Sequence, residues 1–163
     1  MARGGKSQDW RTMGVGTLAS SVGRGLFAGL AGTAAMTASS TLEMKVRGRA
    51  GSSAPADAAQ KVLNISPVDD AAKERFSNLV HWGYGTGWGA VRGVLGAGGF
   101  SSVPATMLHF LAIWGSETVM LPTLGVAPPI TEWGAKEVGI DVLHHLVYAL
   151  STNAAYEWMD ADL

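Results

Sequence analysis

The stretch HWGYGTGWGAVRG, residues 81–93, combines five glycines with two tryptophans, a tyrosine, a histidine and an arginine. A glycine-rich phosphate loop needs a strand before it and a helix after it, and the flanking sequence shows no strand pattern. On a helix that turns about 100° per residue, Tyr84 and Arg92 fall on the same face as His81. We therefore predict a helix with a polar, aromatic face.

Two rows of glycines repeat at helical spacing. One row borders the polar face of residues 81–93, and the other lies in the first apolar segment of the chain. Small residues let helix backbones approach closely, and such packing replaces the hydrophobic effect inside a bilayer. We predict that both rows are helix-packing seams through which the chain also self-associates. The seam residues are Gly25, Gly29, Gly32, Gly85, Gly89 and Gly93.

Charge is sparse over long stretches of this 163-residue chain, of which only 15% is charged, against about a quarter in soluble domains. Residues 79–131 contain two charges, Arg92 and Glu117, and residues 25–42 contain none. A soluble helix needs a polar face, whereas a bilayer span needs about 20 mostly apolar residues. The pattern favours an all-α, polytopic membrane protein over a soluble bundle with a small-residue core. The predicted spans are residues 23–44, 78–99, 103–124 and 137–158.

The segments outside these spans differ in kind. Residues 1–22 are rich in glycine and serine and predict a mobile or surface-lying tail, which leaves 23–163 as a single helical membrane domain. A short amphipathic helical segment is expected between the first and second spans. Ser53 can cap one helix that runs to Leu63, and Ser66 can cap another.

Composition excludes several partners and chemistries. A net charge of −1 gives no reason to expect a nucleic-acid partner. The absence of cysteine excludes disulfides, thiolate metal sites and thiol catalysis. No spacing of nucleophile and base stands out, so we do not expect an enzyme. The sequence assigns no cofactor, and it leaves metal binding undetermined.

Ionisable residues within the predicted spans are the candidates for function, because charges in a bilayer are costly and usually pair in the bundle interior. Asp141 and His145 lie four residues apart and can hydrogen-bond along one helix face. His81 and His145 each precede a tyrosine by one turn, which predicts a histidine–tyrosine layer. Glu43 can lie either at the water interface or inside the bundle. The predicted polar layer comprises His81, Tyr84, Arg92, His109, Glu117, Asp141, His145 and Tyr148.

Three functions are compatible with such a layer. It can consist of structural hydrogen bonds, as in an accessory subunit of a larger membrane complex. It can conduct protons or ions through His81, His109, Glu117 and His145, since histidine titrates near neutral pH. It can also hold a histidine-ligated cofactor; the Glu-x-x-His pairs of di-iron bundles are missing, but a haem needs only two histidines on facing helices.

Three segments resemble the YagU-like family of small bacterial inner-membrane proteins: GLFAGLAGTAAMT (25–37), HWGYGTGWGAVRGVLG (81–96) and HHLVYALSTNAAYEW (144–158). The resemblance implies a multi-pass protein of the bacterial inner (cytoplasmic) membrane, with the lipid bilayer as a partner. It gives no catalytic residues. One member of the family has been tied to acid tolerance, which agrees with proton or ion handling. The polar ending EWMDADL (157–163) departs from the family pattern. A homo-oligomer or a complex with another membrane protein is expected.

Overall fold

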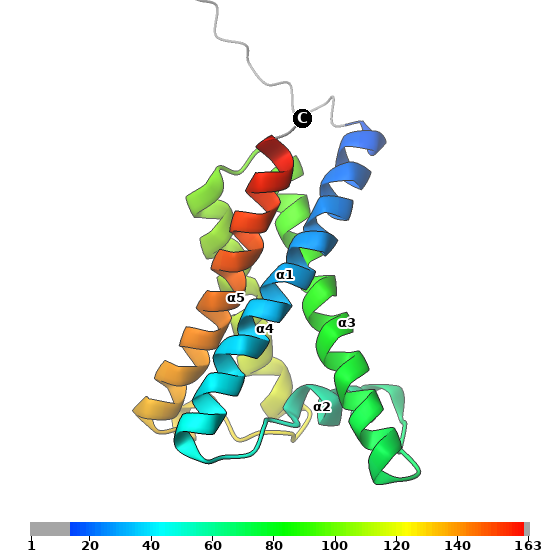
Figure 1. The fold of residues 1–163 in the computed structure, drawn as a ribbon, viewed down its shortest axis with the longest axis vertical. Coiled ribbons are helices and arrows are strands. Elements are labelled where there is room, and N and C mark those ends of the chain that lie inside the picture. Colours follow the sequence, from blue (N-terminus) through cyan, green and yellow to red (C-terminus); the bar gives the residue numbers. More distant parts are fainter. Residues whose placement is uncertain (1–13, 162–163) are drawn as a thin grey trace, which may run out of the picture.

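The structure is a computed structural model that describes residues 14–161 as a bundle of helices, with no strand in this range (Figure 1). Four of the five α-helices are long, and a short α2 and a 3-10 turn, η2, lie in the connections. The all-α class and the helical bundle predicted from the sequence are therefore confirmed. The elements are α1 (Val15–Arg47), α2 (Ala54–Leu63), α3 (Asp70–Ala97), α4 (Ser102–Thr123), η2 (Ile130–Glu132) and α5 (Ala135–Ala161).

The long helices alternate in direction. Helices α1 and α4 run toward the end of the bundle that holds α2, which we call the α2 end, and α3 and α5 run back (Figure 1). The first turn of α1 and the last turn of α5 lie together at the opposite end, the terminal end. Helix α1 is central, because it packs most extensively against α3 and α5, while α4 packs mainly against α5. Figure 1 also shows that α1 and α3 cross closely and then diverge toward the α2 end.

Helix α1 begins earlier than predicted. It starts at Val15, so residues 15–22 belong to a helix and not to the predicted tail 1–22, whose first thirteen residues lie outside the described part. Helix α3 also extends beyond its predicted span, because it starts at Asp70. The two differences have different causes. Residues 15–22 were assigned to a tail because of their glycine and serine content, which does not prevent a helix. The charged residues of 70–77 end the apolar run, but they do not end the helix.

The start of α3 corrects the predicted cap at Ser66. The side chain of Asp69 accepts a hydrogen bond from the backbone N–H of Ala72 at 2.6 Å, as an N-cap residue does. The residues from Ser66 to Val68 are not helical. The second short helix expected here is thus the first part of α3. Helix α2, by contrast, ends at Leu63 as predicted and is the short segment between the first two long helices.

Helix hydropathy does not support the predicted membrane spans. When each helix between residues 14 and 161 is averaged over 18 residues, none is long and apolar enough to qualify as a span.

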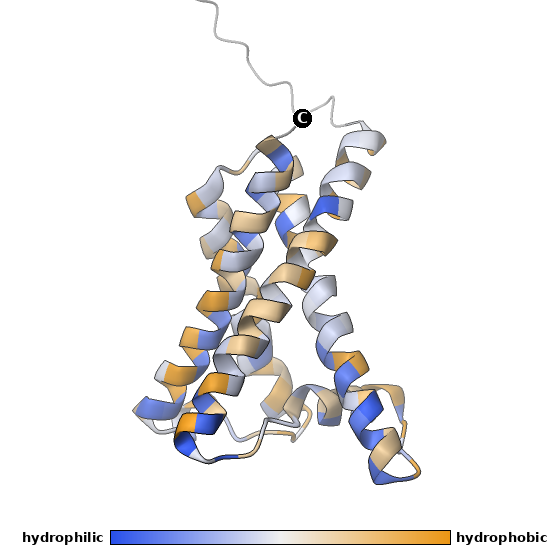
Figure 2. Ribbon diagram, in the orientation of Figure 1, coloured by the Kyte–Doolittle hydropathy of each residue, from blue (hydrophilic) through white to orange (hydrophobic). Residues whose placement is uncertain are grey.

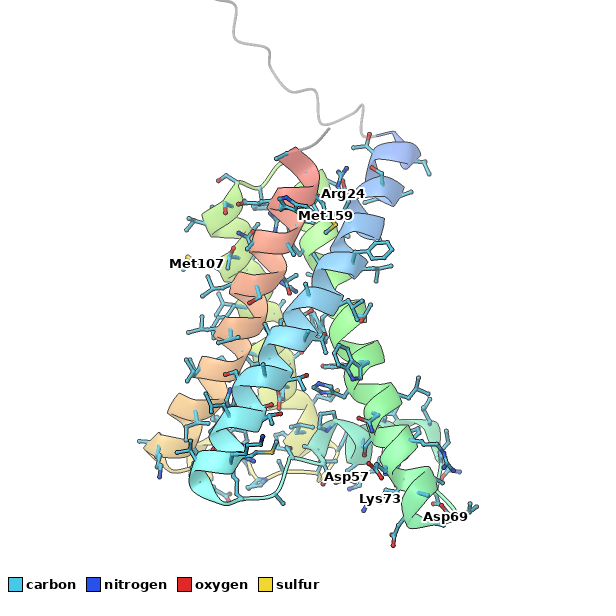
Figure 3. All side chains as sticks on the ribbon, in the orientation of Figure 1. Arg24, Asp57, Asp69, Lys73, Met107 and Met159 are labelled. Atoms are coloured by element: carbon cyan, nitrogen blue, oxygen red, sulfur yellow. The ribbon has the colours of Figure 1, made fainter. Side chains whose placement is uncertain are left out.

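The positions of the side chains in the bundle are more informative than the mean hydropathy of each helix. The largest fully buried side chains are those of Tyr148, His109, Thr33 and Thr152. Many large apolar side chains instead point outward, as Met107 does in Figure 3, and Figure 2 shows the most hydrophilic stretches near the α2 end. Exposed apolar residues on the long helices include Phe27, Leu30, Leu79, Met107, Leu111, Val119, Leu143 and Leu150.

The glycine rows form the contact between α1 and α3. A Cβ added to Gly29 would lie 2.7 Å from the carbonyl oxygen of Thr86 and 2.8 Å from the Cα of Gly89. Gly25 and Gly93 are even tighter against the facing backbone, whereas Gly32 packs against α5 and Gly85 against Thr33. These faces are covered within one chain, so a second copy could not use them without opening the bundle. The sequence predicted self-association through these rows, but the glycine faces are not free surfaces in the folded chain.

Candidate functional site

A cavity of about 320 Å³ lies inside the bundle toward the α2 end. Its walls come from all four long helices and from the segment that precedes α2. Most of the ionisable side chains of the predicted polar layer meet here. Its ionisable and hydroxyl lining includes Thr37, His81, Tyr84, Glu117, Asp141, His144, His145 and Tyr148.

Glu117, Asp141 and His145 form the charged centre of the cavity. The Nε2 atom of His145 lies 2.6 Å from Oε2 of Glu117. Its Nδ1 atom lies 2.9 Å from the backbone carbonyl oxygen of Asp141 and 3.6 Å from the Asp141 carboxylate. The sequence predicted the Asp141 side chain as the partner of His145, but the closest carboxylate is that of Glu117 on α4.

These contacts determine where one proton of His145 lies. A carbonyl oxygen can only accept a hydrogen bond, so the Nδ1 atom of His145 must carry a proton and donate it to Asp141. The Nε2 atom therefore faces Glu117 and shares a single proton with its carboxylate. Trp114 fixes the remaining member of the cluster, because its indole N–H donates to Oδ2 of Asp141 at 2.8 Å.

The other two histidines of the cavity bind hydroxyl groups of α1. The hydroxyl of Thr37 donates to the carbonyl oxygen of Thr33 at 2.7 Å, so it accepts from His81 Nε2, which lies at 2.8 Å. The Nδ1 atom of His144 lies 2.9 Å from the hydroxyl of Ser39. Its Nε2 atom is buried and has no hydrogen-bond partner among the residues that the structure describes.

An ion network at the α2 end holds α1 against α5. Arg47 binds Glu43 one turn before it at 2.9 Å and Glu137 of α5 at 2.6 Å. Arg49 binds Glu43 from the connection to α2 through its Nε at 3.0 Å. Hydrogen bonds from Arg49, and then from Arg47, hold the pKa of Glu43 below its usual range. Glu43 thus lies in the last turns of α1, where a residue at the water interface is expected, yet its side chain is only 13% exposed. It therefore shares features of both positions that the sequence left open, the water interface and the bundle interior.

The same network lowers the pKa of Glu137. The cause is the hydrogen bond from Arg47, whose own pKa is raised by its contacts with Glu137 and Glu43. Both carboxylates therefore stay ionised, and each positive charge of the network is matched by a neighbouring carboxylate. This matching leaves little positive charge free to act on the cavity.

Arg92 does not join the cavity and lies at the terminal end instead. Its Nε donates to the side-chain oxygen of Asn153 at 2.9 Å, and its guanidinium lies 4.1 Å from the ring centre of Tyr156. The amide of Asn153 in turn donates to the hydroxyl of Ser102 at 2.9 Å. Arg92 therefore joins α3 to α5 as a structural group.

His109 is also separate from the cavity. It is fully buried, with Nε2 at 3.0 Å from the backbone oxygen of Trp88 and its ring 5.5 Å from that of Tyr148. Tyr148 of α5 in turn contacts α3, because its hydroxyl donates to the Gly85 carbonyl oxygen at 2.6 Å. The structure thus brings His81, Glu117 and His145 to one cavity and leaves His109 out of it.

Three residues of the site were not assigned to it from the sequence. Thr37 binds His81, Trp114 binds Asp141, and His144 contributes a buried nitrogen. The spacing of Thr33, Thr37 and Thr41 every four residues was the available signal for a hydroxyl stripe on α1. His144 and Trp114 carry no comparable pattern.

Comparisons of this chain with protein-family models, with curated proteins and with solved structures find no match.

Proposed function

We propose that this chain is a multi-pass protein of the bacterial inner membrane, and that its cavity handles protons or other cations. The observation that carries the proposal is the Glu117–Asp141–His145 cluster, which lies inside a bundle whose outer faces are apolar.

The direction of the side chains supports membrane insertion. Segments 25–42, 79–96, 103–121 and 140–156 carry exposed Leu, Val, Phe and Met side chains. The glycines of the two rows are buried in these segments, and so are the side chains of Thr33, His109, His145 and Thr152. These inward residues lower the mean hydropathy of each helix without placing polar groups on its outer face. Each segment rises about 25–28 Å as a helix, which is close to the hydrocarbon thickness of about 30 Å.

The positions of the charges agree with this proposal. The ion network of Glu43, Arg47 and Glu137 lies at the α2 end, beyond segments 25–42 and 140–156, which are shorter than the spans 23–44 and 137–158 predicted from the sequence. The Arg24–Asp160 ion pair at 2.9 Å lies at the terminal end. Figure 3 shows Arg24 beside the last turns of α5. Within the spans, the side chain of Arg92 is 3% exposed and those of Glu117 and Asp141 are about a quarter exposed or less, as expected for intramembrane charges.

The charge balance of the cavity favours cations. Glu117 and Asp141 bring two carboxylates, and Arg49, the one arginine or lysine on the described wall, is held by Glu43. Burying carboxylates in a bundle interior is costly unless a cation or proton balances them. The resemblance to the YagU-like family points the same way.

Membrane insertion can be tested on the full chain expressed in bacteria. We expect the protein to stay in the membrane pellet after washing with alkaline carbonate and to require detergent for extraction. A protein that is released by carbonate and is monodisperse without detergent would overturn the membrane part of the proposal.

Ion handling can be tested in proteoliposomes. We expect the purified chain to increase the flux of protons or divalent cations over protein-free vesicles, and Glu117→Gln to reduce that flux to background. Ser116→Ala is the matched control, because the Ser116 hydroxyl bonds Ile113 of its own helix and is not part of the cavity wall. Wild-type vesicles that pass neither kind of ion faster than empty ones would show that the cavity does not handle ions.

A further inference from the structure

We propose that Glu117, Asp141 and His145 bind a divalent first-row transition-metal ion such as Mn²⁺, Fe²⁺ or Zn²⁺. This inference names the class of ion that the cavity binds. A role of this ion in transport rests on the function proposed above. Binding of the ion does not rest on that function, because it can be measured on the protein in detergent.

The three side chains already converge. One ligand atom from each lies within 4.8 Å of the other two, and no other group of this kind occurs among residues 14–161. Metal–ligand distances for imidazole nitrogen and carboxylate oxygen are about 2.0–2.2 Å. Small rotations of the Glu117 and Asp141 side chains therefore suffice to bring all three atoms to one ion that replaces the proton between His145 and Glu117.

The hydrogen bonds around the cluster prepare His145 as a ligand. Histidines that bind metals usually donate their other ring N–H to a carbonyl or carboxylate, which fixes the tautomer and the ring orientation. Here His145 Nδ1 donates to the Asp141 carbonyl at 2.9 Å, so Nε2 is the atom directed at Glu117. Trp114 supports Asp141 in the same way through its bond of 2.8 Å.

A second, independent observation points to an occupant of the cavity. His144 lines the same cavity and is 6% exposed, yet within the described residues its Nε2 has no hydrogen-bond partner. The nearest acidic atom, Oε2 of Glu43, lies 3.9 Å away. A buried polar atom without a partner is unfavourable, and a hydrated cation in the cavity would supply a water molecule to bind it.

The donor set selects the class of ion. Ca²⁺ prefers six to eight oxygen ligands, and Mg²⁺ retains most of its water, so neither gains from the imidazole. Imidazole together with carboxylates suits Mn²⁺, Fe²⁺ and Zn²⁺. Two carboxylates and a neutral imidazole also carry a charge of −2, which a divalent ion balances in the bundle interior.

The test is a titration of the full chain in detergent, after EDTA treatment and dialysis, with MnCl₂ and with ZnCl₂. Calorimetry measures affinity and stoichiometry, and electron paramagnetic resonance follows bound Mn²⁺. We expect one ion per chain, and at least tenfold weaker binding of Mg²⁺ and Ca²⁺. Glu117→Gln, Asp141→Asn and His145→Gln should each weaken Mn²⁺ binding at least tenfold. Glu132→Gln, an exposed acidic residue of η2, should leave it unchanged.

Trp114→Phe provides a milder variant, because it keeps all three ligands and removes only the indole N–H that positions Asp141. We expect it to weaken binding by about tenfold while gel filtration and circular dichroism match wild type. Absence of binding at millimolar metal, or binding that the ligand variants leave unchanged, would overturn the metal site. A chain that binds Mn²⁺ but gives no flux would overturn the proposed function alone, and a chain that passes protons but binds no metal would overturn this inference alone.

Discussion

Adding one methyl group at Gly29 should destabilise the whole bundle, because Gly29 lies where the backbones of α1 and α3 touch. The new Cβ would meet the Thr86 carbonyl oxygen at 2.7 Å and the Gly89 Cα at 2.8 Å. Both are backbone atoms, which cannot rotate away as a side chain can. Comfortable separations are about 3.5–4.0 Å, so the two helices must move apart by roughly 0.7–1.3 Å.

The cost of that movement follows from the contacts it loosens. A gap of about 0.5–1 Å forfeits a quarter to a half of each dispersion contact, worth about 0.1–0.2 kcal/mol. If the seam holds on the order of 40 such contacts, as many as one buried leucine side chain makes, the loss is about 1–4 kcal/mol. Overpacked cores lose about 1–3 kcal/mol, which overlaps this range. We therefore expect Gly29→Ala to lower the free energy of unfolding by about 2 kcal/mol.

The assay is reversible unfolding of the full chain in mixed micelles, followed by circular dichroism. Gly23→Ala is the matched control, because Gly23 lies on the same helix and a Cβ there meets no atom within 4 Å. That variant should be neutral or up to about 1 kcal/mol more stable, since alanine is the better helix former. Equal stabilities of Gly29→Ala and Gly23→Ala would refute a backbone contact between α1 and α3.

Three further predictions concern single polar contacts. Tyr148→Phe removes the 2.6 Å bond to the Gly85 carbonyl and should lower the free energy of unfolding by about 1 kcal/mol, whereas Tyr84→Phe, at a tyrosine that is 39% exposed, should change it little; equal losses would contradict this. Asn153→Ala leaves Arg92 without its Nε partner and should cost about 1–3 kcal/mol in the same assay, so a neutral result would show that Arg92 finds another acceptor. Glu43 has a pKa below its ordinary value near 4.5 in the folded state, so its ion pairs contribute fully above that pH and are lost as pH falls through the lowered pKa. The stability difference between wild type and Glu43→Gln should therefore be constant near neutral pH and shrink below about pH 4.5; a difference that persists at lower pH would place the effect elsewhere.

Local features of the sequence were sufficient to predict several elements. The four-residue spacing of Gly85, Gly89 and Gly93 indicated one packed helix face, and these glycines are buried against α1. The end of α2 at Leu63 also followed from local signals. Such features depend on residues close in sequence, so they can be read without knowing the neighbouring helices.

The partners within the site could not be predicted in this way. Spacing along α5 favoured Asp141 as the partner of His145, but the 2.6 Å contact is with Glu117 of α4. That contact depends on the relative shift of two helices, which no local pattern determines. The helix ends were misjudged for a related reason, since α3 continues through the charged residues before 78 and only the cap at Asp69 marks its start.

The close approach of α1 and α3 also determines how this chain can change in evolution. At Gly25, Gly29, Gly89 and Gly93 the space is filled by the backbone of the other helix, so a larger residue at any of them requires a new helix crossing. The exposed leucines and valines of the outer faces have no such constraint and can exchange freely among apolar residues. Homologous chains should therefore differ most over their outer faces and agree at these four glycines, so a match at these positions is a better mark of common ancestry than overall identity.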